Sequence, residues 1–506
     1  MAEAYAHAGV SVTVTSLTNL ISFLVCMRTP FLALEVFSQY AALAVVFSYV
    51  WQITLFGGCM ALFGRLEWNN RHALTGRAVV PKSMALTKGR WYRWFCAGGK
   101  NPEDKSNPLD HCDHVLAVVL KNGVGKRLRP WWSKLLVILL FASYFAVGLW
   151  ACSRFQEGTD LDQMFSPSSI AALHLSNERR FFSNYSLRIQ VSILDALDYS
   201  DPRVRDKVEN FTLALERDPH ISNLTESWLR AYTKFVNMIW VLPLKYDLST
   251  KKGYYYCLKN VFFAIPQTKP FAKDIVWSDN ITISASRFFI HTINLATDHD
   301  EKDMFESIKK IAENAPFKVV LYNPKFLTIE QMIVLPKTTI ICVLTTASVM
   351  LLVTLLFFPS LKCGTFVVFS IISIETGVLG YSVLWGVKLN TVTLMGLVMS
   401  VGFAVDNTAH MTYAYTASKQ EDPNRKIEDA LFMVGVPIIL SGTTTVIVVM
   451  ALSVAPSALF VTLFKIIFLI IYMSTMHSIL LLPTLLASYD LFFAQKKQPK
   501  QDLLTK

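Results

Sequence analysis

The chain has 506 residues, of which 53% are hydrophobic and 17% are charged, and its mean hydropathy is +0.38. Soluble globular domains rarely reach this hydrophobic share, so the composition argues against a soluble protein and favours a polytopic membrane protein. The formal net charge of +11 comes largely from one segment between two apolar stretches. We therefore expect no nucleic-acid binding.

Apolar windows of about 20 residues are candidate membrane spans, because the hydrocarbon core is about 30 Å thick and a helix rises about 1.5 Å per residue. The sequence predicts eight such helices, at 10–28, 33–62, 133–152, 336–358, 365–387, 392–413, 434–455 and 458–486. The expected fold is a polytopic α-helical membrane protein.

The segment between the second and third predicted spans is basic. Residues 65–134 carry 14 Lys and Arg against 5 Asp and Glu, and a basic excess near span ends marks the cytoplasmic side. The C-terminal residues are also basic. Because an even number of spans places both chain ends on one side, we predict a cytoplasmic linker at 65–132 and a cytoplasmic tail at 491–506.

The long segment 153–333 is then expected outside the cytoplasm. It carries N-glycosylation sequons at Asn184, Asn210, Asn223 and Asn280, which indicate a glycosylated luminal or extracellular domain.

The periodicity of this segment predicts a small α+β domain. Alternating apolar residues predict strands at 186–194, 283–296 and 317–322. Helical patterns occupy 201–216 and 300–315, and a helical insertion is expected near 225–260.

The eight cysteines are scattered along the chain and form no disulfide framework. We expect free thiols; a bridge between Cys152 and Cys257 is the alternative. The sequence contains no nucleophile motif, phosphate loop or metal-ligand cluster at standard spacing. We therefore expect no enzyme, no cofactor and no bound metal.

The first and last predicted span pairs are related by an internal repeat with an offset of 426 residues. Gly9 falls on Gly435, Thr18 on Thr444 and Pro30 on Pro456. Both copies are predicted to begin on the cytoplasmic side, which makes the repeat parallel. Four predicted spans and the outer domain precede the second copy, so we expect a truncated chain; a naturally short protein is the alternative.

The sixth predicted span contains polar residues that hydrophobicity does not explain. Asp406 is placed about 6 Å to the cytoplasmic side of the midplane, and Gly402 and His410 lie one helical turn to either side of it. A charged residue in a span costs roughly 2.5–3.5 kcal/mol, so Asp406 should face a partner or a water-filled cavity. We interpret Asp406, Asn407 and His410 as an ion-coupling site; a structural hydrogen bond is the alternative.

Two further residues belong to this hypothesis. Thr444, in the stretch SGTTT at 441–445, is placed either to meet Asp406 across a helix interface or to bond its own helix backbone. Glu375 is a second acid within a span, and we rank it below Asp406 as an ion-coupling residue.

Three stretches, taken in order, resemble the patched-related and patched-domain-containing proteins of the resistance–nodulation–division (RND) superfamily. Residues 370–415 resemble their ninth and tenth spans, residues 6–23 resemble their fifth span, and residues 157–169 resemble the start of their second outer domain. The likeness is to the nematode-type members rather than to the Hedgehog receptor itself.

The resemblance implies twelve spans in two repeats, each repeat with a porter-like outer domain. Residues 1–64 would then hold the last two helices of the first repeat, in the C-terminal part of a sterol-sensing domain. The second repeat would comprise the span 133–152, the outer domain 153–333 and a five-helix bundle at 334–490.

The resemblance also implies transport of sterols or other lipids, driven by a proton or monovalent cation through acids of the fourth and tenth spans. Asp406 matches the tenth-span acid, whereas Asn407 departs from the aromatic residue often found after it. The expected partners are membrane lipids, sterol among them, and the coupling ion. Association of the chain into an oligomer is left as an open alternative. The expected location is the plasma membrane or an endosomal or vesicle membrane.

The competing hypothesis is a receptor or regulator that binds sterol or a lipidated ligand without pumping, in the manner of the Hedgehog receptor. The two hypotheses differ in whether an ion gradient matters to the protein.

Glycosidase treatment tests the predicted topology. We expect the expressed protein to migrate faster on a denaturing gel after treatment, because glycans on the segment 153–333 are removed. A control chain with Gln at all four sequon asparagines should migrate at the deglycosylated position without treatment. Unchanged mobility of the wild-type chain would count against an outer location of this segment.

Overall fold

The computed structural model describes residues 2–72, 75–99, 110, 114–155, 158, 165–166, 168–182, 187–239, 248–279, 281–295, 297–357 and 361–497. The chain divides into two compact units. The helical unit comprises Met1–Gln156 and Lys337–Lys506, and the sheet unit comprises Glu157–Pro336.

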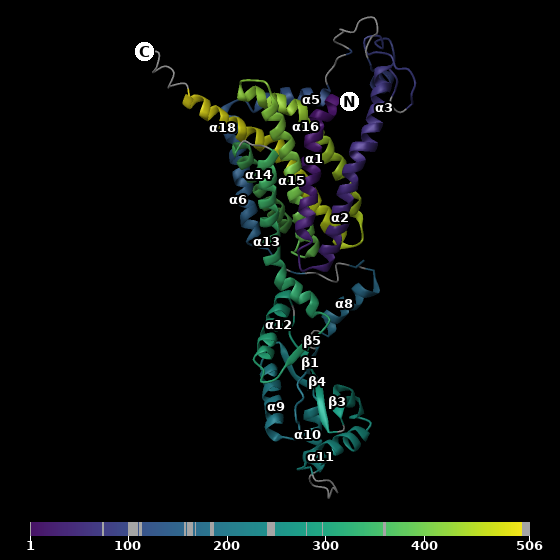
Figure 1. Cartoon of the computed structure of the whole chain (residues 1–506), viewed down its shortest axis with the longest axis vertical. Helices are drawn as coiled ribbons and strands as arrows, with labels where there is room; N and C mark the ends of the chain where they lie inside the picture. Colours follow the sequence, from purple (N-terminus) through teal and green to yellow (C-terminus); the bar gives the residue numbers. More distant parts are fainter. Residues whose placement is uncertain are drawn as a thin grey trace. The chain divides into compact units, whose positions relative to one another are not determined.

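The helical unit is built almost entirely from long helices (Figure 1). Its first part contains α1 (Ala2–Cys26), α2 (Leu32–Trp51), η1 (Gln52–Phe56), α3 (Gly57–Trp68), α4 (Arg90–Phe95), α5 (Val115–Val119), η2 (Leu120–Gly125) and α6 (Trp131–Cys152). Its second part contains α13 (Phe326–Phe357), whose first residues belong to the sheet unit, α14 (Leu361–Leu384), α15 (Thr391–Ala417), α16 (Pro423–Met450), η6 (Ala451–Val454), α17 (Ala458–Met476), η7 (His477–Leu481) and α18 (Leu482–Lys497).

Within the described residues, seven helical stretches are long and apolar enough to cross a membrane. They account for every predicted span except the first. That span falls on α1, a helix of 25 residues whose apolar stretch, Val12–Cys26, is shorter than the others.

The outward faces of these helices carry apolar side chains. Leu344 and Leu352 of α13, and Ile447 and Val448 of α16, are all exposed. Such faces suit hydrocarbon rather than water, and helices satisfy their backbone hydrogen bonds internally, as a bilayer requires. The chain is a multi-pass membrane protein.

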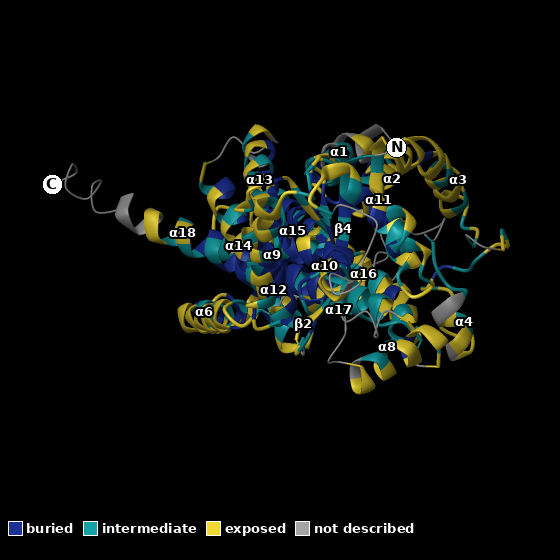
Figure 2. Ribbon diagram, turned by 90° about the horizontal axis from the view of Figure 1, so that it is seen from below, coloured by how far each residue is buried: buried dark blue, intermediate teal, exposed yellow. Residues whose placement is uncertain are grey.

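Helix α15 is the central helix of the helical unit. Figure 2 shows it among buried residues, whereas α3 and α6 are largely exposed. It packs against α1, α14, α16 and α17. Its start is set by Asn390, whose side chain accepts a hydrogen bond of 3.0 Å from the backbone N–H of Thr393.

The internal repeat recurs in the boundaries of the helices. Shifted by the offset of 426, α2 would span 458–477, and α17 is observed at Ala458–Met476. The π-helical turn η1 would fall at 478–482, and the π-helical turn η7 lies at His477–Leu481. Because even this irregular turn recurs, the repeated sequence folds into repeated structure.

The sheet unit contains one five-stranded sheet with the order β2–β4–β1–β5, and β3 also pairs with β4. All of these pairs are antiparallel. The strands are β1 (Arg188–Ile193), β2 (Ile221–Glu226), β3 (Ile275–Asp279), β4 (Thr282–Thr292) and β5 (Val319–Tyr322). The helices are α8 (Ile170–Phe181), α9 (Pro202–Glu216), α10 (Trp228–Ile239), α11 (Lys251–Asn260), η4 (Phe262–Ala264), η5 (Lys269–Asp274) and α12 (Asp298–Glu313).

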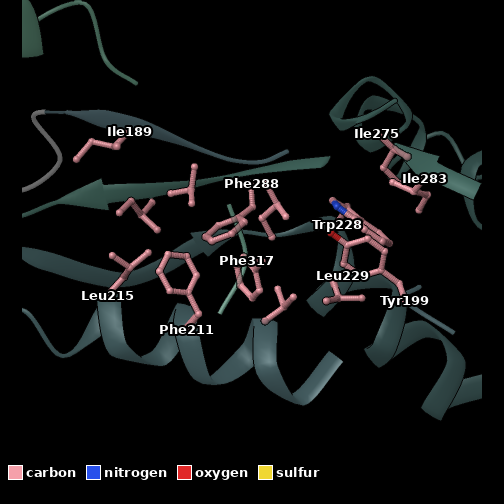
Figure 3. Packing of buried hydrophobic residues seen from close by; sticks show 14 of the residues in the cluster. Ile189, Tyr199, Phe211, Leu215, Trp228, Leu229, Ile275, Ile283, Phe288 and Phe317 are labelled. Carbon is pink, nitrogen blue, oxygen red and sulfur yellow. The ribbon is translucent and has the colours of Figure 1, made fainter. Parts of the chain in front are cut away.

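The core of the sheet unit lies between the sheet and its helices (Figure 3). Phe211 and Leu215 of α9 belong to one buried cluster with Ile189 of β1 and Phe288 of β4. The same core holds Tyr199, whose hydroxyl bonds Ser286 Oγ at 2.7 Å. Burial raises the pKa of Tyr199 to about 12, so this hydroxyl keeps its hydrogen at neutral pH.

The predicted strands and helices of the α+β domain are confirmed, including the helical insertion, which forms α10 and α11. Strands β2 and β3 were not predicted, because the sequence of β2, ISNLTE, lacks apolar alternation and β3 has only 5 residues. Cys152 and Cys257 are free, as expected.

Two of the predicted glycosylation sites are described by the structure. Asn210 on α9 and Asn223 on β2 are both exposed, so a glycan on either would meet no packed core. Asn184 and Asn280 lie outside the described residues.

The contact between α6 and α14 depends on glycine. A Cβ atom on Gly380 would lie 2.3 Å from the carbonyl oxygen of Gly148. We expect Gly380→Ala to lower the unfolding temperature of the purified chain, because overpacking costs roughly 1–3 kcal/mol. The control is Gly58→Ala in α3, where a Cβ would meet no described atom within 4 Å. Equal stability of the two variants would contradict this close approach.

Candidate functional site

Asp406 is half-buried on α15 and receives hydrogen bonds from α1. The side-chain amide of Asn19 donates from Nδ2 to Asp406 Oδ2 at 3.0 Å. The hydroxyl of Thr18 lies 3.3 Å from Asp406 Oδ1. Both partners are neutral, and both belong to a helix within this chain.

Thr18 can bond Asp406 in either of its charge states. Its Oγ1 lies 2.8 Å from the carbonyl oxygen of Thr15 as well as within reach of Asp406. A hydroxyl has one hydrogen to donate but can also accept. When Asp406 is ionised, Thr18 donates to the carboxylate. When Asp406 is protonated, its O–H donates to Thr18, whose own hydrogen then bonds Thr15.

Gly402, one turn before Asp406, allows α1 to approach α15. A Cβ atom at this position would lie 2.2 Å from Asn19 Oδ1. Any side chain here would therefore push Asn19 away from Asp406. The structure thus brings Gly402 and Asp406 into contact with the same residue of α1.

Asp406 borders a cavity of about 1030 Å³ within the helical unit. Thr15 of α1, His410 of α15 and Ser441 of α16 line the same space. The lining continues to Lys419, beyond the end of α15. The sequence predicts this end of α15 to be cytoplasmic, so the cavity runs from that end of the bundle to Asp406.

The cavity is charged at its far end. Asp429 of α16 lines it and accepts a hydrogen bond of 3.1 Å from the hydroxyl of Ser418. Its other oxygen lies 3.9 Å from Lys121 Nζ in η2. Asp429 therefore already has a countercharge.

No such countercharge meets Asp406. Among the described residues, no lysine or arginine forms an ion pair with it. The described residues also contain no group of three or more His, Cys, Asp or Glu side chains able to hold a metal ion. The site is one carboxyl group with neutral donors.

Asn407 connects α15 to another helix. Its Nδ2 donates to Ser474 Oγ of α17 at 3.0 Å, and that hydroxyl lies 3.1 Å from the carbonyl oxygen of Phe403. Asn407 also lines the cavity. The amide thus holds α15 in place beside Asp406.

Two of the predicted site residues lie away from Asp406. Thr444 is exposed, does not line the cavity, and bonds the carbonyl oxygens of Leu440 and Ser441 in its own helix, both at 2.9 Å. Of the two interpretations of Thr444, the structure shows the bond to its own helix backbone and not the contact with Asp406. Glu375 is buried on α14 and contacts Ser400 of α15, outside the lining of the cavity.

Sequence reasoning missed Thr18 and Asn19 as the partners of Asp406. The repeat carried the signal, because it aligns Thr18 with Thr444 and Asn19 with Thr445. From the sequence, only the copy on α16 is predicted to meet Asp406, as one of two alternatives, whereas the structure places the copy on α1 against it.

Comparisons with known proteins cover most of the chain. The Patched SSD family model matches residues 1–62. Patched-related protein 9 of Caenorhabditis elegans is 24% identical over 493 residues, which cover 96% of this chain and 54% of that protein. The Niemann-Pick type C1-related protein of Plasmodium falciparum (isolate 3D7) is 21% identical over 404 residues, covering 73% of this chain and 28% of that protein. The chain spans about half the length of the first of these relatives and less of the second.

A solved structure has a similar fold. The hedgehog release protein Disp from the water bear Hypsibius dujardini matches with a TM-score of 0.61 at 16% identity, covering 96% of this chain and 59% of that chain. At this identity the likeness concerns the fold alone.

Thiol labelling tests whether water fills the cavity. We expect a charged, water-soluble thiosulfonate to label Ser441→Cys beyond the background of the native cysteines, because Ser441 lines the cavity. The matched control is Thr444→Cys, nearly one turn further along α16 and outside the lining, which should stay at background. Equal labelling of both variants, or of neither, would contradict a water-filled cavity at this place.

Proposed function

We propose that the chain is a patched-related membrane protein of the RND type, whose helical unit couples a proton or a monovalent cation at Asp406 to the movement of a sterol or another lipid. The observation that carries the proposal is a carboxyl group that borders a cavity and whose hydrogen-bond donors, within the described ranges, are neutral. The match to the Patched SSD model supports the lipid cargo.

Asp406 suits this role because it has no fixed countercharge in the part of the chain that the structure describes. A permanent ion pair would hold the carboxylate ionised and compete with a transported ion. Asn19 and Thr18 instead stabilise the charged group while leaving its charge uncompensated. Binding a proton or a monovalent cation then removes an unbalanced charge from the bundle, which ties ion binding to the free energy of the helix arrangement.

The coupling ion would reach Asp406 through the cavity. His410 lines this route one turn from Asp406, and its ring nitrogens can donate and accept hydrogen bonds there. Lys419 and Asp429 lie at the far end, on the side predicted to be cytoplasmic. The proposed path therefore joins Asp406 to the cytoplasm.

The remaining predicted residues have supporting roles. Gly402 admits Asn19, and Asn407 holds α15 to α17 through Ser474. A change in the charge of Asp406 would therefore act on α1 directly and on α17 through α15. This gives the bound ion a mechanical connection to three helices.

Transport by the complete protein is the measurable consequence. In cells that express the full-length form, we expect Asp406→Asn to reduce gradient-dependent sterol redistribution to the level seen when the ion gradient is collapsed. An asparagine keeps the size of the side chain but has no carboxylate to bind the ion. Sterol distribution across the membrane is the readout.

The repeat supplies a matched pair of control variants. Thr18→Val removes a partner of Asp406, and Thr444→Val removes the equivalent hydroxyl on α16, which bonds its own helix. We expect the first to impair transport and the second to leave it intact. Normal transport by Asp406→Asn would overturn the coupling role of Asp406, whereas a wild-type protein whose sterol distribution ignores the ion gradient would favour the receptor that binds without pumping.

A further inference from the structure

A second carboxyl group is enclosed in the helical unit away from the cavity. Glu375 on α14 is only 7% exposed and is not among the residues that line the cavity. Its Oε1 contacts the hydroxyl of Ser400 on α15. Its Oε2 is buried and has no hydrogen-bond partner among the described residues.

The count of hydrogens at Ser400 bears on the charge of Glu375. Ser400 Oγ also lies 2.6 Å from the carbonyl oxygen of Leu397 in its own helix, a bond that serines within helices commonly make. The hydroxyl has one hydrogen and two neighbouring acceptors. If that hydrogen goes to Leu397, the hydrogen in the other contact must come from Glu375 itself.

The neutral acid satisfies this arrangement and the carboxylate does not. A protonated Glu375 donates to Ser400 Oγ, which donates in turn to Leu397. An ionised Glu375 would be left with one shared donor and one oxygen without any donor, inside an apolar bundle. Burying a charge under these conditions is far more costly than burying the neutral acid.

The titratable groups that face this part of α14 are neutral. On α6, the Tyr144 hydroxyl donates to the carbonyl oxygen of Ser373 at 3.2 Å, and the Cys152 thiol faces the carbonyl oxygen of Thr376 at 3.7 Å. The ring of Tyr381, on α14 itself, stacks on that of Tyr144.

The hydrogen bonds of His477 in η7 fit the neutral imidazole. Its Nδ1 lies 2.8 Å from the carbonyl oxygen of Met473, which can only accept, so Nδ1 bears the hydrogen. Its Nε2 lies 2.9 Å from Ser373 Oγ, which can donate to it.

The charged groups on the other helices that pack on α14 lie elsewhere. Lys465 of α17 bonds the carbonyl oxygen of Trp385, beyond one end of α14, at 3.0 Å. Asp490 of α18 pairs at 2.8 Å with Lys362, at the other end of α14. On α15, Asp406 and His410 line the cavity.

We propose that Glu375 is a second proton-binding site, in which the proton is shared with Ser400 and holds α14 against α15. Release of this proton would leave an unpaired carboxylate between the two helices and weaken their contact. Because α15 also carries Asp406, the proton on Glu375 governs how firmly the coupling helix is held. The site stands on its own contacts, so it holds whether or not Asp406 carries a transported ion.

The first test is stability against pH, measured on the purified full chain. We expect Glu375→Gln to be at least as stable as the wild type at neutral pH, because the glutamine amide donates to Ser400 as the neutral acid does and needs no proton on folding. A buried acid that is neutral in the folded state stabilises at low pH, and this contribution is lost as pH rises. As pH rises from the acidic range, where a free glutamate ionises, to the alkaline range, the wild-type unfolding temperature should therefore fall by more than that of Glu375→Gln. Asp406→Asn is the matched control, and it should keep the part of the wild-type loss that depends on Glu375.

The second test needs no variant and reads the proton directly. Infrared spectra of the wild-type chain at neutral pH should contain the carbonyl stretch of a protonated carboxylic acid that shifts when glutamate is labelled with carbon-13. The label separates Glu375 from Asp406. Absence of this band, or a Glu375→Gln variant that folds but is much less stable than the wild type at neutral pH, would overturn the proposal.

Discussion

A carboxyl group inside a helix bundle has to find its hydrogen bonds within the protein, and Asp406 finds them on α1. The bonds from Asn19 and Thr18 bring a helix from the start of the chain onto α15. That approach requires glycine at position 402, because a side chain there would displace Asn19. The position of the cavity follows as well, since α1, α15 and α16 form its walls around the acid.

Asp406 and Glu375 lie on neighbouring helices, α15 and α14, and have different surroundings. Asp406 borders the cavity and accepts from an amide that can only donate, which stabilises a charge. Glu375 is enclosed between α14 and α15 and contacts a serine that can accept. Helix α15 therefore carries a carboxyl group suited to exchange with water, and it contacts a second one, on α14, that is suited to keep its proton.

The internal repeat shows how similar sequence can take different roles. Thr18 and Asn19 of α1 occupy the positions of Thr444 and Thr445 of α16. On α1 these residues bond Asp406, whereas Thr444 and Thr445 bond carbonyl groups of their own helix. The difference arises from which helix lies opposite. A hydroxyl in a helix is equally able to bond its own backbone or a neighbour.

Periodicity and hydrophobicity by themselves determined the long apolar helices, the strands and helices of the α+β domain, the repeat, and the unusual position of Asp406. These features depend on residues close together in sequence, where spacing is informative. Tertiary structure decided the partners of Asp406, the placement of Thr444 outside the cavity, and the enclosure of Glu375. Asn19 and Asp406 are 387 residues apart, and no local pattern states which helix faces will meet. That choice depends on how whole helices pack. Neighbouring helices come so close at Gly402 and Gly380 that a side chain at either position would not fit.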